Sequence, residues 1–213
     1  MRAMQRMVQH RKSSFAFGSD ACGASAIEFA LILPIMLAIP FGISEFSRAT
    51  DYYRKVTVLA RTVADLTSQG DATTPIAAAT MADIMASAKL VLTPYASGSA
   101  SIVVSALGVP ADGVGQRPQV CSSYATGSGT ARALGAAADL KVPDGFQIIG
   151  MRYVLAEVSV PYAPLLGSNL MRFVGGANNQ FTFKANVPWP VRGGQPAKSS
   201  YNEVVMPGGK ACT

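Results

Sequence analysis

A glycine and a glutamate stand at the start of a long apolar run. Gly23 is followed by four small or apolar residues and then by Glu28 and Phe29. A carboxylate at membrane depth costs on the order of 3 kcal/mol and usually has a partner. Cleavage between Gly23 and Ala24 would create an α-amine one helical turn from Glu28, and pairing would relieve the desolvation cost of both charges. We therefore interpret Glu28 as a docking charge that sets the axial register between adjacent helices.

The run behind Glu28 is long enough to cross a bilayer. From Ala24 to Phe46 there are 23 residues, and Glu28 and Glu45 are their only charges. Such a helix would measure about 34 Å, against about 30 Å for the hydrocarbon core. Residues 1–23 carry four basic groups and one acid, which favours a cytoplasmic N-terminus.

Other uses of this segment fit less well. A lipoprotein signal is excluded by order, because Cys22 precedes the apolar run instead of following it. A cleaved secretory signal is disfavoured, because residues 42–50 offer a poor small-x-small site. A plain membrane anchor is the bland alternative, but it leaves Glu28 unexplained.

The three cysteines divide between the two sides of the expected membrane. Cys22 lies in the basic N-terminal segment, and Cys121 and Cys212 follow the apolar run. Beyond a bacterial inner membrane lies the oxidising periplasm, where an even pair suggests one disulfide, Cys121–Cys212, worth about 4–5 kcal/mol by loop-closure entropy. Free thiols and zinc are the alternatives. Two thiolates are too few for zinc, and the only histidine, His10, precedes residue 24.

The groups that an enzyme needs are missing from residues 24–213. This part has no histidine, no SxxK box and only 11 scattered acidic residues. The Gly-rich run 124–132 lacks the Lys-Ser/Thr of a phosphate loop. We expect no catalytic residue, no cofactor and no metal. Nucleic-acid binding is also not expected, because half of the net charge of +6 lies in residues 1–23.

Two helices are predicted to position these residues. The helical period continues from the apolar run to a stop at Gly70. Its stripe could pack on the chain's own C-terminal part, on neighbouring subunits, or on both. A second helix is expected from an N-cap at Thr74, with Pro75 at the first helical position, to Pro94, with methionines filling core space. The first stripe comprises Phe46, Ala49, Tyr53, Val56, Ala60 and Val63, widened by Leu59 and Leu66; the methionines are Met81 and Met85.

After Ser97 the sequence changes to short β-like runs separated by turn residues. Consecutive strands with short turns favour an antiparallel sheet that rests one face on the first helix, so the predicted class is α+β. The domains are a basic leader (1–23), a membrane-spanning and amphipathic helix (24–69) and an α+β domain (70–213). Strands are predicted at 101–109, 118–126, 151–161 and 180–189, a helical turn within 133–146, a short helix or loop at 168–176, and an irregular tail from Arg192.

The N-terminal pattern resembles the prepilin-peptidase site of type IV pilins, and in particular the TadE-like pseudopilins of the tight-adherence (Flp) system. The family pattern is matched by Gly23, Ala26, Glu28, Phe29, Ala30, Pro34, Gly42, Glu45 and Arg48. The resemblance implies that an aspartic prepilin peptidase removes residues 1–23 at the Gly23–Ala24 bond. Glu28 and Phe29 would then serve recognition and helix docking. TadE-like proteins often carry a cysteine pair, in agreement with Cys121 and Cys212.

This resemblance implies a minor pseudopilin that supports pilus biogenesis and surface adhesion, since major Flp pilins are far shorter. Its partners would be the prepilin peptidase, other pilins and pseudopilins, and the assembly platform in the inner membrane. The chain would span the bacterial inner membrane once, with a cytoplasmic N-terminus and a periplasmic C-terminal domain, and could enter the surface pilus. The alternative is an unprocessed, single-pass, membrane-anchored periplasmic binding module.

Overall fold

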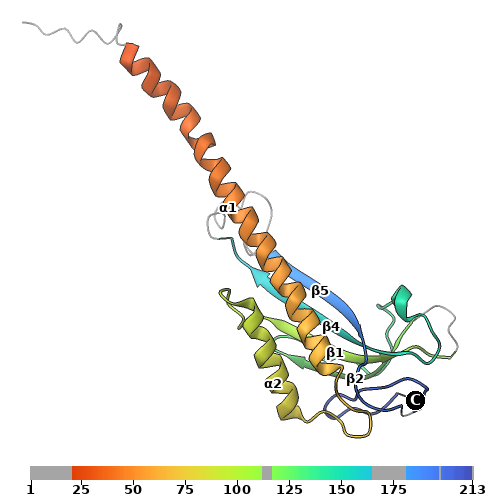
Figure 1. Cartoon of the computed structure of the whole chain (residues 1–213). Helices are drawn as coiled ribbons and strands as arrows, with labels where there is room; N and C mark the ends of the chain where they lie inside the picture. The colour runs from red at the N-terminus through yellow and green to blue at the C-terminus, as the bar shows by residue number, and fades with distance from the viewer. Residues whose placement is uncertain (1–20, 112–116, 165–180, 197, 213) are drawn as a thin grey trace, which may run out of the picture. The chain divides into compact units, whose positions relative to one another are not determined.

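The computed structural model describes residues 21–111, 117–164, 181–196 and 198–212 (Figure 1). It confirms the α+β class: a long N-terminal helix and a second helix accompany a five-stranded sheet. The elements are α1 (Ala21–Thr67), α2 (Ala78–Lys89), the 3-10 turn η1 (Leu90–Leu92), β1 (Ser101–Gly108), β2 (Gln119–Thr126), β3 (Gly135–Ala136), the 3-10 turn η2 (Asp144–Phe146), β4 (Arg152–Tyr162) and β5 (Phe181–Pro190).

The sheet has the order β3-β2-β1-β4-β5, and every neighbouring pair is antiparallel. The four longer strands lie within one residue of their predicted ends, because Pro and Gly clusters bound each run. The two-residue β3 was not predicted. The predicted helical turn is η2, and the predicted helix or loop at 168–176 lies outside the described residues.

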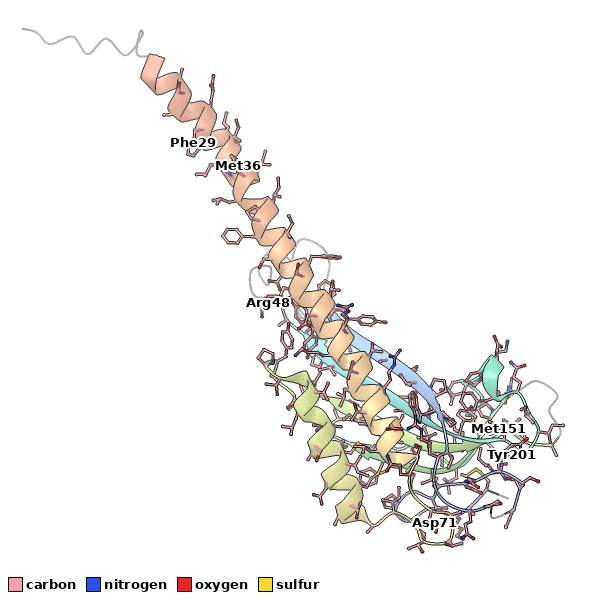
Figure 2. The ribbon with its side chains drawn as sticks, in the orientation of Figure 1. Phe29, Met36, Arg48, Asp71, Met151 and Tyr201 are labelled. Atoms are coloured by element: carbon pink, nitrogen blue, oxygen red, sulfur yellow. A yellow bond between two sulfur atoms is a disulfide. The ribbon has the colours of Figure 1, made fainter. Side chains whose placement is uncertain are left out.

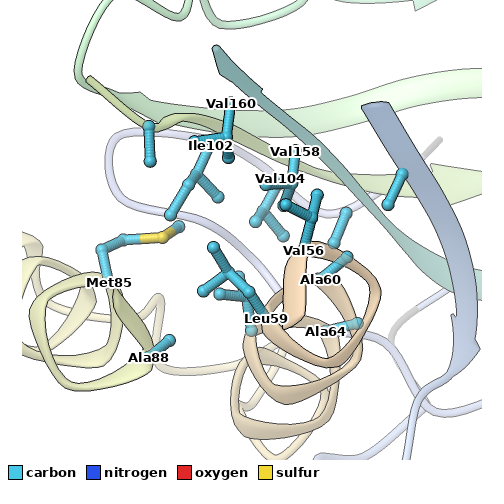
Figure 3. Close-up of a cluster of buried hydrophobic side chains, with 14 of the residues drawn as sticks. Val56, Leu59, Ala60, Ala64, Met85, Ala88, Ile102, Val104, Val158 and Val160 are labelled. Atoms are coloured by element: carbon cyan, nitrogen blue, oxygen red, sulfur yellow. The ribbon is translucent and has the colours of Figure 1, made fainter. Parts of the chain in front are cut away.

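The chain divides into two compact units, Met1–Ser44 and Glu45–Thr213, so the boundary falls inside α1. We call the second unit the body. In the body, the helical stripe of α1 packs on the chain's own sheet together with α2. Figure 3 shows this core, in which Val56 and Leu59 of α1 and Met85 of α2 converge on Ile102 and Val158 of β1 and β4.

The phase of the predicted α1 stripe was partly wrong. Tyr52, which is 3% exposed, lies in the core, whereas Tyr53 is 50% exposed and Phe46 is 74% exposed. The buried stripe therefore runs from Tyr52 through Val56 and Leu59. Adjacent tyrosines fit the helical period almost equally well, and the sheet selects the one that faces it.

The predicted start of α2 was also wrong. The helix begins at Ala78 after an N-cap at Ala77, and not at Thr74. The backbone N–H of Ile76 donates to the carbonyl of Val205 over 3.0 Å, and Asp71 accepts hydrogen bonds from Thr73. These bonds hold the segment before residue 77 in a turn and against the tail.

The tail after β5 is irregular, as predicted, but it is well packed. The N–H groups of Arg192 and Gly193 both donate to the carbonyl of Ser68 over 3.0 Å, which caps the end of α1. A Cβ on Gly193 would lie 2.4 Å from the carbonyl oxygen of Gln69, so this close approach requires glycine. Farther along, Val204 is fully buried in the core.

Among the residues that the structure describes, only half of the second face of the sheet is covered. One end carries a smaller core in which Leu107, Val120 and Tyr153 pack beneath the segment that contains η2. At the other end, Val103, Glu157 and Asn186 face each other across β1, β4 and β5 and line a groove.

Candidate functional site

The predicted processing and docking residues lie in the first turns of α1. Gly23, Ala24, Glu28 and Phe29 are all exposed, and a Cβ placed on Gly23 would meet no atom within 4 Å. Ala24 and Glu28 are four residues apart, so they lie one turn apart on the same side of the helix. Figure 2 shows Phe29 projecting away from the helix axis. The helix thus presents the Gly23–Ala24 bond and the Glu28 carboxylate on one uncovered surface.

Glu28 makes no hydrogen bond or salt bridge with any other residue that the structure describes. Its surroundings are apolar, with Ile27 65% exposed and Leu31 72% exposed on either side. A carboxylate among uncovered apolar side chains has no counter-charge within its own described chain. An amine created at Ala24 would supply such a counter-charge one helical turn away.

Every residue from Gly23 to Ser44 is exposed, and this surface is apolar on all sides. The large members are Ile27, Phe29, Leu31, Ile32, Leu33, Ile35, Met36, Leu37, Ile39, Phe41 and Ile43. Water-soluble monomers rarely leave contiguous apolar patches larger than a few hundred Å², and a helix that is apolar all round is usually buried in protein or lipid.

Among the described residues, one helix, Gly23–Thr67, is long and apolar enough to cross a membrane. A signal sequence near an N-terminus passes the same test. The apolar helix could therefore anchor the chain in a membrane.

Glu45 and Arg48 follow the exposed apolar stretch, and Glu45 fixes α1 to the sheet. The hydroxyl of Tyr162, at the end of β4, donates to Oε1 of Glu45 over 2.6 Å. Burial, followed by this hydrogen bond, raises the pKa of Tyr162 to about 12, and the nearby Arg48 opposes the shift. Glu45 and Arg48 belonged to the sequence pattern. Their partners could not be predicted from it, because Tyr162, which binds Glu45, and Tyr95, whose hydroxyl donates to the carbonyl of Arg48 over 3.4 Å, are 117 and 47 residues away in the chain.

An aromatic cluster surrounds this attachment. The hydroxyl of Tyr52 donates to the carbonyl of Pro161 over 3.2 Å, and its ring lies 4.7 Å from the ring of Tyr95 and 5.1 Å from that of Tyr162. Tyr95 in turn donates to Asp51 over 3.0 Å. The start of the body is therefore held to β4 and to the segment after η1 by packed rings whose hydroxyls have partners.

The structure joins Cys121 and Cys212 by a disulfide, with Cα atoms 4.9 Å apart and a sequence separation of 91. Beside the sulfur atoms lies a buried ion pair that the sequence did not reveal. Glu203 is 1% exposed and Arg152 is 7% exposed, and Oε2 of Glu203 lies 3.6 Å from Nε of Arg152. The backbone N–H of Cys212 also donates to Glu203.

Cys121, Cys212 and Glu203 bring potential metal-ligand atoms within 4.8 Å of one another. A disulfide offers no thiolate ligands, and the guanidinium of Arg152 already faces the carboxylate of Glu203. The geometry therefore fits a structural bridge over a buried ion pair better than it fits a metal site.

A second charged cluster lies in the groove on the open face of the sheet. Arg132 grips Glu157 with two hydrogen bonds of 2.5 and 2.7 Å and bonds Asp139 over 2.9 Å. The bond to Glu157 raises the pKa of Arg132, and the bond to Arg132 lowers the pKa of Asp139. The groove has a volume of about 440 Å³ and is also lined by Lys184 and Asn186. From the sequence, the segment with Arg132 was read only as a flexible turn.

Comparisons with known proteins give one match, and it falls on the N-terminal helix. No curated protein and no solved structure matches the chain. The family described as "TadE-like protein" matches residues 23–65. The matched residues begin at Gly23, include Glu28, Glu45 and Arg48, and end two residues before the end of α1. The resemblance is therefore confirmed over this segment, where the chain is similar to TadE-like proteins.

Proposed function

We propose that this chain is a minor pseudopilin that takes part in assembling a tight-adherence (Flp) pilus. The observation that carries the proposal is the coincidence of the TadE-like match with the exposed helix that begins at Gly23 and bears Glu28. In this role, α1 supplies an apolar surface for the membrane and for neighbouring helices. The body, which includes the second half of α1, is the part that distinguishes this subunit.

The chemistry of the proposed maturation is peptide hydrolysis by a separate aspartic prepilin peptidase. Water adds across the Gly23–Ala24 bond and leaves a carboxylate on Gly23 and an amine on Ala24, which is protonated at neutral pH. The bond lies in the first turn of α1, which begins at Ala21, so only the helix end must unwind for cleavage. The new ammonium then pairs with Glu28 of its own chain or of a neighbour.

This proposal includes a location and a set of partners. Residues 1–23 would face the cytoplasm, α1 would cross the bacterial inner membrane, and the body would lie in the periplasm, where the Cys121–Cys212 disulfide is stable. Its partners would be the peptidase, other pilins and pseudopilins, and the assembly platform. In this proposal the chain is a structural subunit and not an enzyme.

The mass of the chain from its native cell envelope tests the processing step. A chain that starts at Ala24 supports the proposal, and a chain that starts at Met1 in piliated cells contradicts it. Gly23→Val should block cleavage by filling the space beside the scissile bond. A start near Thr50 would indicate ordinary secretion.

Glu28→Ala tests the docking role separately from processing. We expect this variant to be cleaved normally but to assemble few pili, because the new amine has lost its counter-charge. Asp83→Ala is a matched control, since Asp83 is an exposed acid on α2 and should leave piliation unchanged. Normal piliation of Glu28→Ala would rule out the pairing.

A second function is favoured by the groove on the open face of the sheet. Its lining of Ser101, Arg132, Lys184 and Asn186 is polar enough to hold a ligand, as a membrane-anchored binding module would require. In that case Lys184→Ala would abolish the biological role, and removal of the Glu28 charge would not.

A further inference from the structure

The length of the apolar stretch indicates where Glu45, the first residue of the body, would lie relative to a bilayer. Ala24–Ser44 comprises 21 residues, or about 31 Å of helix, which matches the hydrocarbon thickness of about 30 Å. If this stretch spans the bilayer, as the proposed function requires, Glu45 stands at the edge of the hydrocarbon. The headgroup layer then extends about 5–8 Å beyond it.

The hydrogen bond between Glu45 and Tyr162 holds one end of the sheet beside Glu45. Its length of 2.6 Å fixes the end of β4 beside the first residue after the apolar stretch. Phe181, the first residue of β5, lies directly opposite Tyr162 in the ladder. Two strand ends that are remote in sequence therefore lie close to Glu45.

The side chains at this end of the body are unusual for a water-exposed surface. Phe46 is 74% exposed and Phe181 is 48% exposed, although buried aromatic rings lie close by in Tyr52 and Tyr162. Arg48 lies about 6 Å along the helix from Ser44, and its side chain is partly exposed and lies near the hydroxyl groups of Tyr95 and Tyr162. Aromatic rings and arginine side chains are the groups that settle at membrane interfaces.

We propose that Phe46, Arg48 and Phe181 form a lipid-contact surface that rests in the headgroup layer of the bilayer that α1 spans. The two rings would lie among the glycerol and upper acyl groups, and the guanidinium would bind lipid phosphate. The body would thus contact the membrane surface before the subunit enters the pilus.

Depth-dependent quenching by brominated lipids tests this surface. The chain has a single tryptophan, Trp189, so Trp189→Phe provides a background for one new tryptophan at a time. Phe181→Trp should be quenched at least twofold more strongly than Ile148→Trp in proteoliposomes at high lipid-to-protein ratio. Ile148 is matched in exposure, at 51%, but precedes β4, whose 11 residues separate it from Tyr162 by about 33 Å.

Phe41→Trp separates failure of this proposal from failure of the membrane anchor. Strong quenching at position 41 with equal, weak quenching at 181 and 148 would overturn the lipid-contact surface and leave the anchor intact. Loss of quenching at 41 as well would overturn the anchor.

A measurement on the unaltered chain guards against misfolded variants. A lipid with a photoreactive group in its headgroup should crosslink the peptides that contain Phe46 and Phe181 in preference to the peptide that contains Ile148. Equal labelling of all three peptides would contradict the proposal. Arg48→Gln should reduce this labelling in bilayers that contain anionic lipid.

Discussion

The two halves of α1 share one secondary structure but differ in what surrounds their apolar side chains. Between Gly23 and Ser44 every residue is exposed, and the apolar side chains point in all directions. Between Glu45 and Thr67 the apolar side chains form a stripe, and residues such as Leu59 and Val63 are completely buried against the sheet. Helical structure alone thus does not decide which part of the chain folds as a soluble body.

This difference shows which apolar surface the chain buries by itself and which surface lipid or another protein must cover. The second half of α1 obtains its hydrophobic stabilisation from its own sheet, so the body can fold as one unit. The first half finds no such cover among the described residues, and lipid or other helices must provide it. Mutations in the second half should therefore lower the stability of the fold, whereas mutations in the first half should affect contacts with lipid or with other helices.

The largest contrast is expected from the same substitution in each half. Leu59→Ala should lower the free energy of unfolding by about 2–5 kcal/mol, because it opens a cavity in the core. Leu37→Ala, in the exposed half, should change it by less than about 0.5 kcal/mol. Urea unfolding of the full chain in detergent, followed by Trp189 fluorescence, measures both. Equal effects would mean that the two halves do not differ as described.

The disulfide should stabilise the body and not the exposed half. Replacing both Cys121 and Cys212 by serine should cost about 2–4 kcal/mol in the same unfolding assay. Cys22→Ser is the matched control and should have no effect, because Cys22 precedes the expected cleavage site. Peptide mapping without reductant should recover the two cysteines in one crosslinked fragment; separate, alkylated peptides would show free thiols instead.

Removing one hydrogen bond should weaken the attachment of α1 to β4 at the start of its second half. Tyr162→Phe removes the hydroxyl that donates to Glu45 and should cost about 1.5 kcal/mol, as for other bonds to charged groups. Tyr53→Phe, which alters an exposed tyrosine, should be close to neutral. If both variants were neutral, the hydrogen bond from Tyr162 to Glu45 would not contribute to holding α1 against β4.

Alkaline pH should act on the body in a defined direction. The pKa of Tyr162 is raised to about 12 from about 10, so the folded state holds this proton more tightly than the unfolded chain does. Its stabilising contribution is complete below about pH 10 and is lost as the pH approaches 12. For this one group the loss at pH 11 is about 1 kcal/mol, and Tyr162→Phe should reduce the alkaline loss by that amount.

Much of the fold could be predicted because its signals are local. The apolar run, the helical period and the Pro- and Gly-bounded β runs each lie within a few consecutive residues, and they gave α1, the longer strands and the α+β class. Where two readings fitted locally, packing decided between them. The sheet selected Tyr52 over Tyr53, and the tail shortened α2 by binding the N–H of Ile76.

The site divides in the same way. The pattern from Gly23 to Arg48 is read in one short segment and agrees with the family match. The partners of Glu45, Arg132 and Arg152 are 117, 25 and 51 residues away in the sequence. Finding them requires the register of the sheet and the path of the tail, which no local pattern contains. Cleavage after Gly23 and pairing of Glu28 are still predictions.

The cap on α1 has a consequence for how the chain is made. The groups that close the end of this helix come from Arg192 and Gly193, and the neighbouring turn is held by Val205. A ribosome synthesises the apolar stretch well before these residues. The nascent protein can therefore engage an insertion machinery while the end of α1 is still uncapped, and the body can complete its packing only after Val205 has been synthesised.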